Sequence, residues 1–395
     1  MQILKCAVAI LLAAPIFGSG GNPELPQGLT VHEWGTFTTV ADEAGGSHPW
    51  SPLGGPSDLP CFVLHLHGKQ YKSLAPPTDA LANQTVTVRM ETPVLYFYSP
   101  RKTTVSVGVD FPRGLITEWY PNASKVSPEP DRTLPPVAQG HIEWNSFEIT
   151  PGEKPWLPHG AGASHYYAAR ETDADPVSVF LGRDREKFLF YRGIANFAVP
   201  LSARMAGDST VELRNTGDAA LALAVLFENR GGRIGYRVMR GFEGRAEIGA
   251  PELTGNLDHL KQELSAALVA QGLYRKEADA MVETWHDSWF EEGMRIFYLV
   301  PRKMVDRELP LTVQPAPAAT QRVFVGRVEL LSPTMRDRLR TALAEGNSQV
   351  LDRFGRFLAP FMQQLKGNAA PSVANYLAAK SDQAKQEFYT PSCVR

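Results

Sequence analysis

The sequence predicts an α+β protein: a large antiparallel domain, β-sandwich-like and spanning residues 21–248, precedes a smaller mixed domain at residues 249–395 with a helical C-terminal end. Apolar residues repeat at the spacing of strands before residue 248 and at the spacing of helices after it. A chain of 395 residues also exceeds the size at which a single core usually stops growing, which favours two domains.

The strands of the first domain are indicated by alternation of apolar and polar residues. Residues 104–111 show it most clearly, with Val, Val, Val and Phe at every second position, as in a strand with one buried face. Residues 94–98 and 187–191 are apolar on both faces and are expected to be central strands. The segment Asn215–Asp218 predicts a hairpin turn between two further runs. Short strands separated by turns favour sandwich-type packing.

Two long stretches interrupt this pattern, at residues 43–60 and 121–160. Both are rich in proline, and the first is rich in glycine and serine as well. Loops of this length are uncommon in a compact domain and often carry function, so ligand contacts are expected to concentrate there.

The second domain begins with a helix, because four leucines fall at helical spacing before Gly272, a residue typical of helix ends. The further elements expected are a helix at 278–289, strands at 295–300 and 322–331, a helix that Ser332 caps and Pro333 begins, and a longer helix at 350–365 that Pro360 kinks.

The N-terminus has the pattern of a cleavable signal peptide over residues 1–20: a basic residue, Lys5, then an apolar stretch, then a small-residue tail. The apolar stretch is shorter than the roughly 20 residues that a spanning helix needs. We therefore expect cleavage near Gly18–Gly21 and a mature protein that is soluble, periplasmic or secreted, and without a transmembrane segment.

The amino-acid composition and net charge limit the classes of molecule that the protein is expected to bind. Hydrophobic residues make up 43% of the chain and charged residues 21%, which is typical of a folded soluble protein. The formal net charge of -2 argues against nucleic acid as the main partner. The partner is therefore expected to be a small molecule, a glycan or a component of the cell envelope.

Cys61 and Cys393 are the cysteines left after the signal peptide, and an oxidising compartment favours a disulfide between them.

Three segments carry a resemblance: VHEWGTFTTV at residues 31–40, SWFEEGMRIFYLVPR at 288–302 and FVGRVELLSP at 324–333. With these motifs the chain resembles a set of uncharacterised exported bacterial proteins, over most of its mature length. The resemblance implies export and no particular activity.

The sharpest candidate for chemistry is the pair His65 and His67, because alternate residues of a strand share a face and two imidazoles so placed suit one zinc, copper or iron ion. A third ligand is needed, and His32 is favoured over Glu33, since both segments are expected to be strands of one domain. The other candidates for this place are His159 and His165. The familiar motifs of serine hydrolases, phosphate loops, zinc proteases and dinucleotide binding are not found in the sequence.

The sequence contains two further groups of acidic residues with a candidate role. The chain has three Glu-Trp dipeptides, Glu33-Trp34, Glu118-Trp119 and Glu143-Trp144, which suggest sugar binding. Neighbouring strand residues point to opposite faces, so a buried Trp beside an exposed Glu, or the reverse, is favoured instead. Glu291 and Glu292 oppose the dipole at a helix end, which predicts at least one Glu–Arg pair, with Arg295 and Arg302 the nearest cations in sequence.

The sequence therefore predicts an exported protein that acts as a ligand-binding or envelope-associated module. The alternative is a metal-dependent hydrolase or oxidoreductase centred on His65 and His67, with zinc as the first candidate ion. Measurement of bound metal separates the two.

Overall fold

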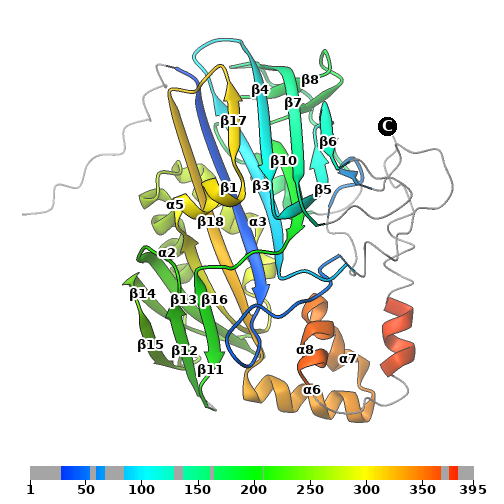
Figure 1. The fold of residues 1–395 in the computed structure, drawn as a ribbon, viewed down its shortest axis with the longest axis vertical. Helices are drawn as coiled ribbons and strands as arrows, with labels where there is room; N and C mark the ends of the chain where they lie inside the picture. Colours follow the sequence, from blue (N-terminus) through cyan, green and yellow to red (C-terminus); the bar gives the residue numbers. More distant parts are fainter. Residues whose placement is uncertain are drawn as a thin grey trace, which may run out of the picture.

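The computed structural model describes residues 28–53, 59–66, 84–128, 137–160, 164–207, 209–365 and 373–380. Within these ranges the protein is mostly β, with several antiparallel sheets and a helical C-terminal region (Figure 1). This coarse prediction is confirmed. The predicted signal peptide, residues 1–20, lies outside the described residues. No helix among the residues described has the length and apolar character needed to cross a membrane.

The largest sheet has nine strands in the order β14-β13-β16-β18-β1-β3-β10-β5-β2. The strands are β1 (Thr30–Val40), β2 (Leu64–His65), β3 (Val88–Tyr98), β5 (Gly114–Tyr120), β10 (Leu189–Ala195), β13 (Leu221–Arg230), β14 (Arg233–Phe242), β16 (Gly293–Val300) and β18 (Ala319–Leu330). Strands β1 and β18 run parallel, and the other neighbours are antiparallel. Both runs that are apolar on two faces lie inside this sheet, in β3 and β10, as predicted.

Two smaller sheets complete the β structure. One contains β17 (Leu311–Gln314), β4 (Thr103–Phe111), β7 (Gly140–Ile149), β8 (Val177–Val179), β9 (Asp184–Glu186) and β6 (Lys125–Ser127). The other contains β11 (Leu201–Met205), β12 (Thr210–Asn215) and β15 (Arg245–Gly249). The turn at Asn215–Asp218 joins β12 to β13, which belong to different sheets, so the hairpin predicted there is wrong: the chain leaves one sheet and enters another.

The helices are η1 (His165–Arg170), α2 (Leu257–Ala270), α3 (Arg275–Thr284), α4 (His286–Trp289), α5 (Arg302–Glu308), α6 (Pro333–Glu345), α7 (Ser348–Asp352), η2 (Gly355–Phe357) and α8 (Leu358–Gln364). Ser332 caps α6 by accepting a hydrogen bond from the amide of Met335, as predicted. The single helix predicted at 350–365 is broken instead at Gly355, whose φ is +50°. Pro360 lies in the first turn of α8, where its ring is tolerated.

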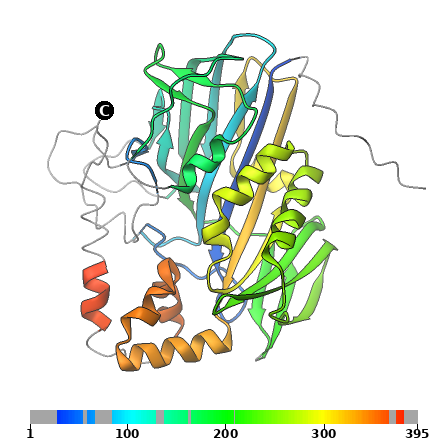
Figure 2. The ribbon, with the colours of Figure 1, turned by 180° about the vertical axis from the view of Figure 1, so that it is seen from behind.

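Three apolar clusters hold these elements together. The first lies between the nine-stranded sheet and the two smaller sheets and includes Phe37, Phe111 and Leu213. The second lies on the opposite face of the nine-stranded sheet, beneath η1, α2, α3 and α4 (Figure 2). The third joins Val40 and Leu331 to helices α6 to α8. The central sheet is therefore covered on both faces.

The strand order also bears on the predicted boundary between residues 248 and 249. Strands β16 and β18 follow that boundary in the sequence, yet they lie between β13 and β1, which precede it. The boundary therefore does not separate two sheets: both halves of the chain contribute central strands to one sheet.

Candidate functional site

A row of polar residues crosses the helix-covered face of the nine-stranded sheet. Its members are Arg295 on β16, Arg327 and Glu329 on β18, Thr36 and Thr38 on β1, Arg89 and Glu91 on β3, Arg192 on β10 and Glu118 on β5. All of them are buried. Register places them side by side, because Thr38 is opposite both Arg327 and Arg89. We call these nine residues the polar row.

Strand alternation brings the row to this face. On β18, Val323 and Val325 pack beneath the helices of the second apolar cluster, and the next residues of the same parity are Arg327 and Glu329. On β1, Thr36 and Thr38 follow Trp34 in the same way, before Val40 enters the third cluster. The polar row therefore lies at the seam between the second and third clusters.

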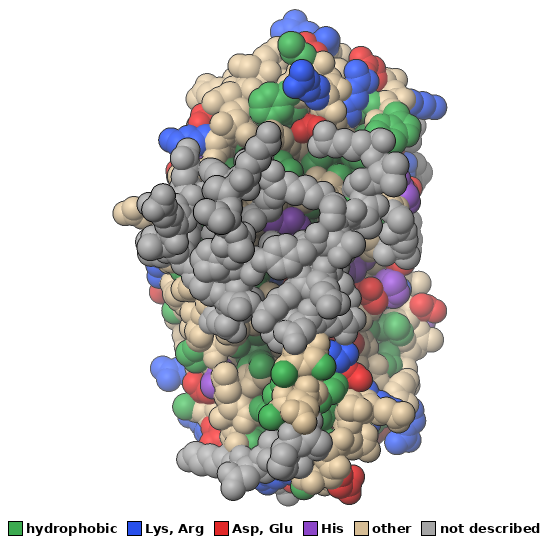
Figure 3. Space-filling view, turned by 90° about the vertical axis from the view of Figure 1, so that its right-hand side faces the viewer, with side chains coloured by type: hydrophobic (Ala, Val, Ile, Leu, Met, Phe, Trp, Pro, Cys, Tyr) green, Lys and Arg blue, Asp and Glu red, His purple; other side chains and the backbone are tan. Residues whose placement is uncertain are grey.

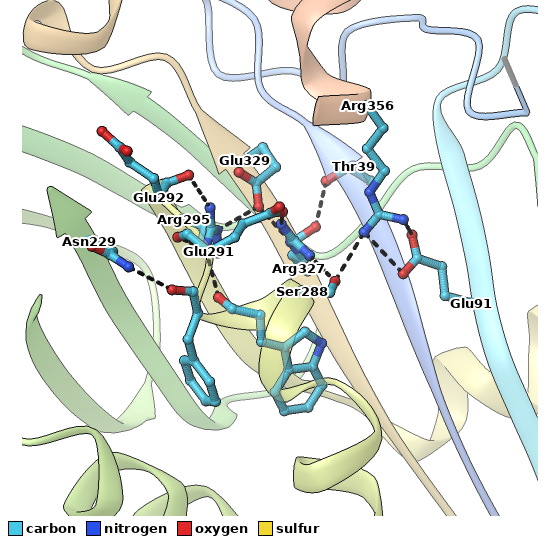
Figure 4. A network of polar contacts seen from close by, with 12 residues as sticks. Thr39, Glu91, Asn229, Ser288, Glu291, Glu292, Arg295, Arg327, Glu329 and Arg356 are labelled. Atoms are coloured by element: carbon cyan, nitrogen blue, oxygen red, sulfur yellow. Dashed lines mark hydrogen bonds and ion pairs between the residues drawn. The ribbon is translucent and has the colours of Figure 1, made fainter. Parts of the chain in front are cut away.

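One half of the row is a closed network of charges (Figure 4). Glu329 accepts hydrogen bonds at one carboxylate oxygen from Nε of Arg295, at 2.8 Å, and from Nε of Arg327, at 2.5 Å. Arg327 also donates to Oε1 of Glu291, at 2.7 Å, and to Oγ of Ser288, at 2.8 Å. Both guanidinium groups are thus paired inside the protein, as burial of charge requires.

Arg295 also binds backbone carbonyls at the C-terminal end of α4. Its guanidinium donates to the backbone carbonyls of Trp289, Glu291 and Glu292. A cation that meets carbonyls left over at a helix end satisfies them and complements the dipole. The predicted Glu–Arg pairing is confirmed, but the partners differ: Glu291 pairs with Arg327 and Glu292 with Arg338, and both of these arginines are distant in sequence.

The C-terminal helices close over this half. Arg356 donates to Oε1 of Glu91 at 2.6 Å. The ring of Phe357 lies 4.9 Å from the guanidinium carbon of Arg327 and 5.1 Å from that of Arg356. Such cation–π contacts are favourable when they are desolvated. The segment at η2 is therefore fixed to the sheet through the polar row as well as through the third apolar cluster.

The other half of the row contains Arg89, Arg192 and Glu118. Arg89 donates to Oε1 of Glu118 at 3.2 Å, and Arg192 reaches the hydroxyl of Thr92 at 3.3 Å. Thr92 has φ of +43°, a backbone conformation that β-branched residues rarely adopt. Here β1, β3 and β10 all shift register, so their regular pairing is interrupted at one level of the sheet. Strain of this kind is concentrated at functional sites.

Burial and charge oppose each other at the two acids of the row. Burial alone would raise the pKa of Glu329, but Arg295 and Arg327 outweigh it and lower that pKa. Burial likewise acts to raise the pKa of Glu118, and Arg89 and Arg192 outweigh it. Both carboxylates are therefore held in the charged form.

These shifts predict acid sensitivity. A carboxylate whose pKa is lower in the folded chain stabilises it above the unfolded value, here 4.5, and loses that effect as the pH falls through the folded value. Asp175 and Glu186 act in the opposite sense, because burial raises their pKa. The melting temperature of the chain should fall below pH 4.5, and less steeply for Glu329→Gln. Parallel acid limbs for the two proteins would contradict this.

Three polar atoms of the polar row and the indole nitrogens of two nearby tryptophans have no hydrogen-bond partner among the described residues. They are Thr36 Oγ1, Thr38 Oγ1, Arg89 Nη1, Trp285 Nε1 and Trp289 Nε1. The guanidinium and indole nitrogens can only donate, whereas the hydroxyls can do both. An unsatisfied buried polar atom in a native protein calls for an explanation, and a ligand rich in acceptor oxygens would satisfy this set.

Two of the predicted metal ligands, His32 and His65, do not meet. His32 is buried, and its Nδ1 lies 2.8 Å from Oε2 of Glu277, which also accepts from the hydroxyl of Tyr98. His65 lies on β2, and three strands separate β2 from β1. At about 4.8 Å per strand the two strands are roughly 19 Å apart. His32 therefore cannot share an ion with His65.

The remaining candidates lie apart as well. Glu33 is on the opposite face of β1 from His32, where it accepts from Arg322 and Tyr191. His159 stacks on Tyr167, and His165 lies 3.4 Å from Asp287. His67 lies outside the described residues. Within the described ranges, no cluster of three or more His, Cys, Asp or Glu side chains is arranged to hold a metal ion.

In one of the three Glu-Trp dipeptides the exposure is as predicted, because Trp144 is buried and Glu143 is half-exposed. The other two follow the predicted alternation but not the predicted exposure. Trp34 and Trp119 are core residues of different clusters, and their neighbours Glu33 and Glu118 are buried too. Each of these acids pairs with an arginine, Arg322 or Arg89, that sequence reasoning did not connect to it. The sequence pattern therefore did not predict that Glu33 and Glu118 are buried and charged.

The disulfide between Cys61 and Cys393 stays a prediction, because Cys393 lies outside the described residues. Cys61 is near the loop at Gly160, and a Cβ at that glycine would lie 3.3 Å from Sγ of Cys61. We expect peptide mapping without reductant to recover both cysteines in one linked peptide. Alkylation of both thiols in the unreduced, unfolded chain would rule the bond out.

Sequence reasoning missed most of the polar row, although one signal pointed to it. The three segments that carry the resemblance, at 31–40, 288–302 and 324–333, contain β1, the end of α4 with β16, and the end of β18. These strands are neighbours in the sheet. The three segments thus converge on the network of Figure 4.

The comparisons with known proteins add little to this description. No family model and no curated protein matches the chain. A solved structure, the yeast delta-COP-I mu-homology domain, is matched over 77% of this chain and 96% of that chain, with 7% identity and a TM-score of 0.28. A likeness of this size supports no argument about fold or function.

Proposed function

We propose that this chain is an exported module that binds a small, acceptor-rich ligand at the polar row. The observation that carries the proposal is the row itself: charged and polar side chains buried at a seam, with donors left unpaired within the described residues. Buried charges cost stability unless they are fully satisfied, and apolar residues in their place are often as stable or more so. Their presence here is explained by a ligand.

The fold supports this use of the seam. We propose that the nine-stranded and six-stranded sheets pack as a sandwich, since the first cluster contains inward residues of both. The polar row lies on the other face of the large sheet, beneath the helices that cover it. There the helices at 333–364 are fixed by Arg356 and Phe357, and their movement would open the row to a ligand.

A glycan or hydroxylated acid fits the row better than a nucleic acid. On the side of the molecule seen in Figure 3, Lys and Arg occur together with Asp and Glu at both the upper and lower ends. A nucleic-acid surface would concentrate one sign of charge. The unpaired donors instead match scattered oxygens of a small ligand.

The test is a melting-temperature screen with glucose, glucuronate and citrate. A ligand present at 100 times its Kd adds about 2.7 kcal/mol to the free energy of unfolding. The double variant Thr36→Val, Thr38→Val removes two hydroxyls and keeps side-chain shape, so it should lose most of the shift. Thr150→Val is the control, because Thr150 is also buried but bonds the carbonyl of Pro176 on the edge of another sheet. Equal shifts in all three proteins would contradict binding at the row.

Export has its own test. We expect material recovered outside the cytoplasm to begin near Gly18–Gly21 on N-terminal sequencing. Recovered chains that still carry Lys5 would contradict cleavage there, and would leave the binding test unaffected.

The metal-dependent alternative is supported by one observation. His65 is opposite Glu118 on the neighbouring strand, and a histidine with a carboxylate is a ligand pair that zinc accepts. Elemental analysis of the purified chain should then find one zinc, lost in the double variant His65→Gln, His67→Gln. A zinc content that the variant retains would place the ion elsewhere.

A further inference from the structure

Two apolar side chains lie at the tip of the hairpin that joins β8 to β9. Leu181 is 108% exposed and Phe180 is 43% exposed. The hairpin is at the end of the six-stranded sheet, far from the C-terminal helices (Figure 1). Among the described residues, Trp156 is the only other large hydrophobic side chain that is exposed. An apolar residue exposed singly is ordinary, but two adjacent ones at one tip call for an explanation.

The backbone of this tip is strained. The φ angle is +50° at Phe180, +58° at Leu181 and +85° at Gly182, so three consecutive residues lie in the left-handed region. Glycine adopts this region without cost, whereas bulky residues rarely enter it. The hairpin between β13 and β14 turns on two glycines instead, Gly231 and Gly232, with φ of +60° and +82°. Strain that gains Leu181 no packing in return is typical of a functional position.

The segment that carries Trp156 lies next to this hairpin. Nη1 of Arg185, on β9, is 3.8 Å from Oε2 of Glu153, which is three residues before Trp156. Trp156 is 80% exposed, whereas the other six tryptophans of the chain are buried. An indole has an apolar body and one polar N–H, and tryptophan is enriched where water meets lipid. All three exposed apolar side chains therefore come from neighbouring segments.

The charged groups around the tip favour an anionic surface. Lys154 and Arg183 are exposed, and neither has an ion pair among the described residues. The acids beside them are engaged within the protein. Glu153 forms the ion pair described above, and Asp184 accepts the backbone N–H of Asn122 at 3.2 Å. Because the formal net charge of the chain is -2, attraction to an anionic surface has to come from such a local group.

We propose that this tip docks on the surface of an anionic lipid bilayer. Phe180 and Leu181 enter the acyl region, Trp156 lies at the level of the headgroups, and the two unpaired cations meet lipid phosphates. The pairing of β8 with β9 already fixes the backbone of the tip, so little conformational entropy is lost on docking. This surface shares no residue with the polar row, so it does not depend on the ligand proposed there.

Flotation of the purified full chain with vesicles tests this, using phosphatidylcholine with and without phosphatidylglycerol. We expect the chain to bind the mixed vesicles. Phe180→Asn, Leu181→Gly should weaken that binding by more than about tenfold, because the apolar anchors are gone. The same variant should melt at the same temperature or higher, since Asn-Gly suits a left-handed turn. Its loss of binding could then not be ascribed to unfolding.

The charges have their own variant and a matched control. Lys154→Gln, Arg183→Gln should weaken binding to the mixed vesicles about 25-fold, because each cation near an anionic surface contributes about fivefold. Arg233→Gln is the control, since Arg233 is also exposed and also follows a left-handed turn, but on another sheet. It should bind as the parent chain does. The Thr36→Val, Thr38→Val protein should also float normally, which keeps this test separate from that of the polar row.

Trp156 gives a direct readout of the bound geometry, because it is the one exposed tryptophan of the seven. Mixed vesicles should protect its fluorescence from quenching by iodide. Four results would overturn the proposal: no binding of the parent chain, undiminished binding of Phe180→Asn, Leu181→Gly, equal binding to phosphatidylcholine alone, or unchanged quenching in the bound chain. Parent and variants share one N-terminus, so attachment through that end would leave all of them bound alike.

Discussion

Replacing Arg327 with methionine is expected to lower the free energy of unfolding by about 3–5 kcal/mol. The guanidinium is fully buried and pairs with Glu329 and Glu291. Without it, Glu291 loses its ion pair, Glu329 keeps only Arg295, and Phe357 loses one of its two cation–π contacts. Methionine fills similar space, so the loss reports the charge and hydrogen bonds rather than a cavity. Denaturant unfolding followed by circular dichroism measures it.

The control for this change is Arg353→Met. Arg353 also pairs with a glutamate of the same segment, Glu292, at 3.7 Å, but its side chain is 55% exposed. Exposed ion pairs contribute about 0–1 kcal/mol, so this variant should unfold nearly as the parent does. If both variants lost the same small amount, the polar row would not hold the C-terminal helices to the sheet.

The second large effect is expected at Gly326, in the middle of β18. A Cβ on this residue would lie 2.0 Å from Cζ of Tyr298, which is directly opposite on β16. No side chain fits without displacement of the buried tyrosine ring, and overpacking of a core costs about 1–3 kcal/mol or more. Gly326→Ala should therefore unfold at clearly lower denaturant concentration.

A double-mutant cycle identifies the cause. In a Tyr298→Leu background the same alanine should cost much less, because the ring that it meets is gone. Gly108→Ala on β4 is the matched control, since the nearest atom to its Cβ would be 3.7 Å away on His141, an ordinary contact. Equal costs with and without the tyrosine ring would show that the strain lies in the backbone.

Local periodicity was enough to predict much of the secondary structure. β4 has the predicted buried face, α2 begins at Leu257 and is followed by Gly272, and Ser332 caps α6. These features depend on residues close together in sequence, where side-chain direction follows directly from the period.

Local periodicity does not predict which of those elements are neighbours in space. A strand pattern tells which residues share a face but not which strand lies alongside. The sequence places His32 and His65 only on strands of one domain, and in the sheet β3, β10 and β5 lie between those strands. For the same reason the turn at Asn215–Asp218 was expected to join two strands of one sheet, whereas it joins strands of different sheets.

The polar row was missed for a related reason. A charge in a strand is usually taken to mark the solvated face, so Arg327 and Glu329 would be assigned to solvent by their type alone. Their parity with Val323 and Val325 places them inside instead. Only the neighbouring strand supplies the partner, Arg295, that makes burial tolerable.

The parallel pairing of β1 with β18 has a consequence for the order in which the chain can fold. Thr30 is aligned with Ala319, so the centre of the largest sheet joins segments from nearly opposite ends of the sequence. Contacts of such long range slow folding, because the loop between them must close first. In a chain that crosses a membrane N-terminus first, β1 would reach the far side before its partner strand β18. The sheet could not be completed until β18 had also crossed.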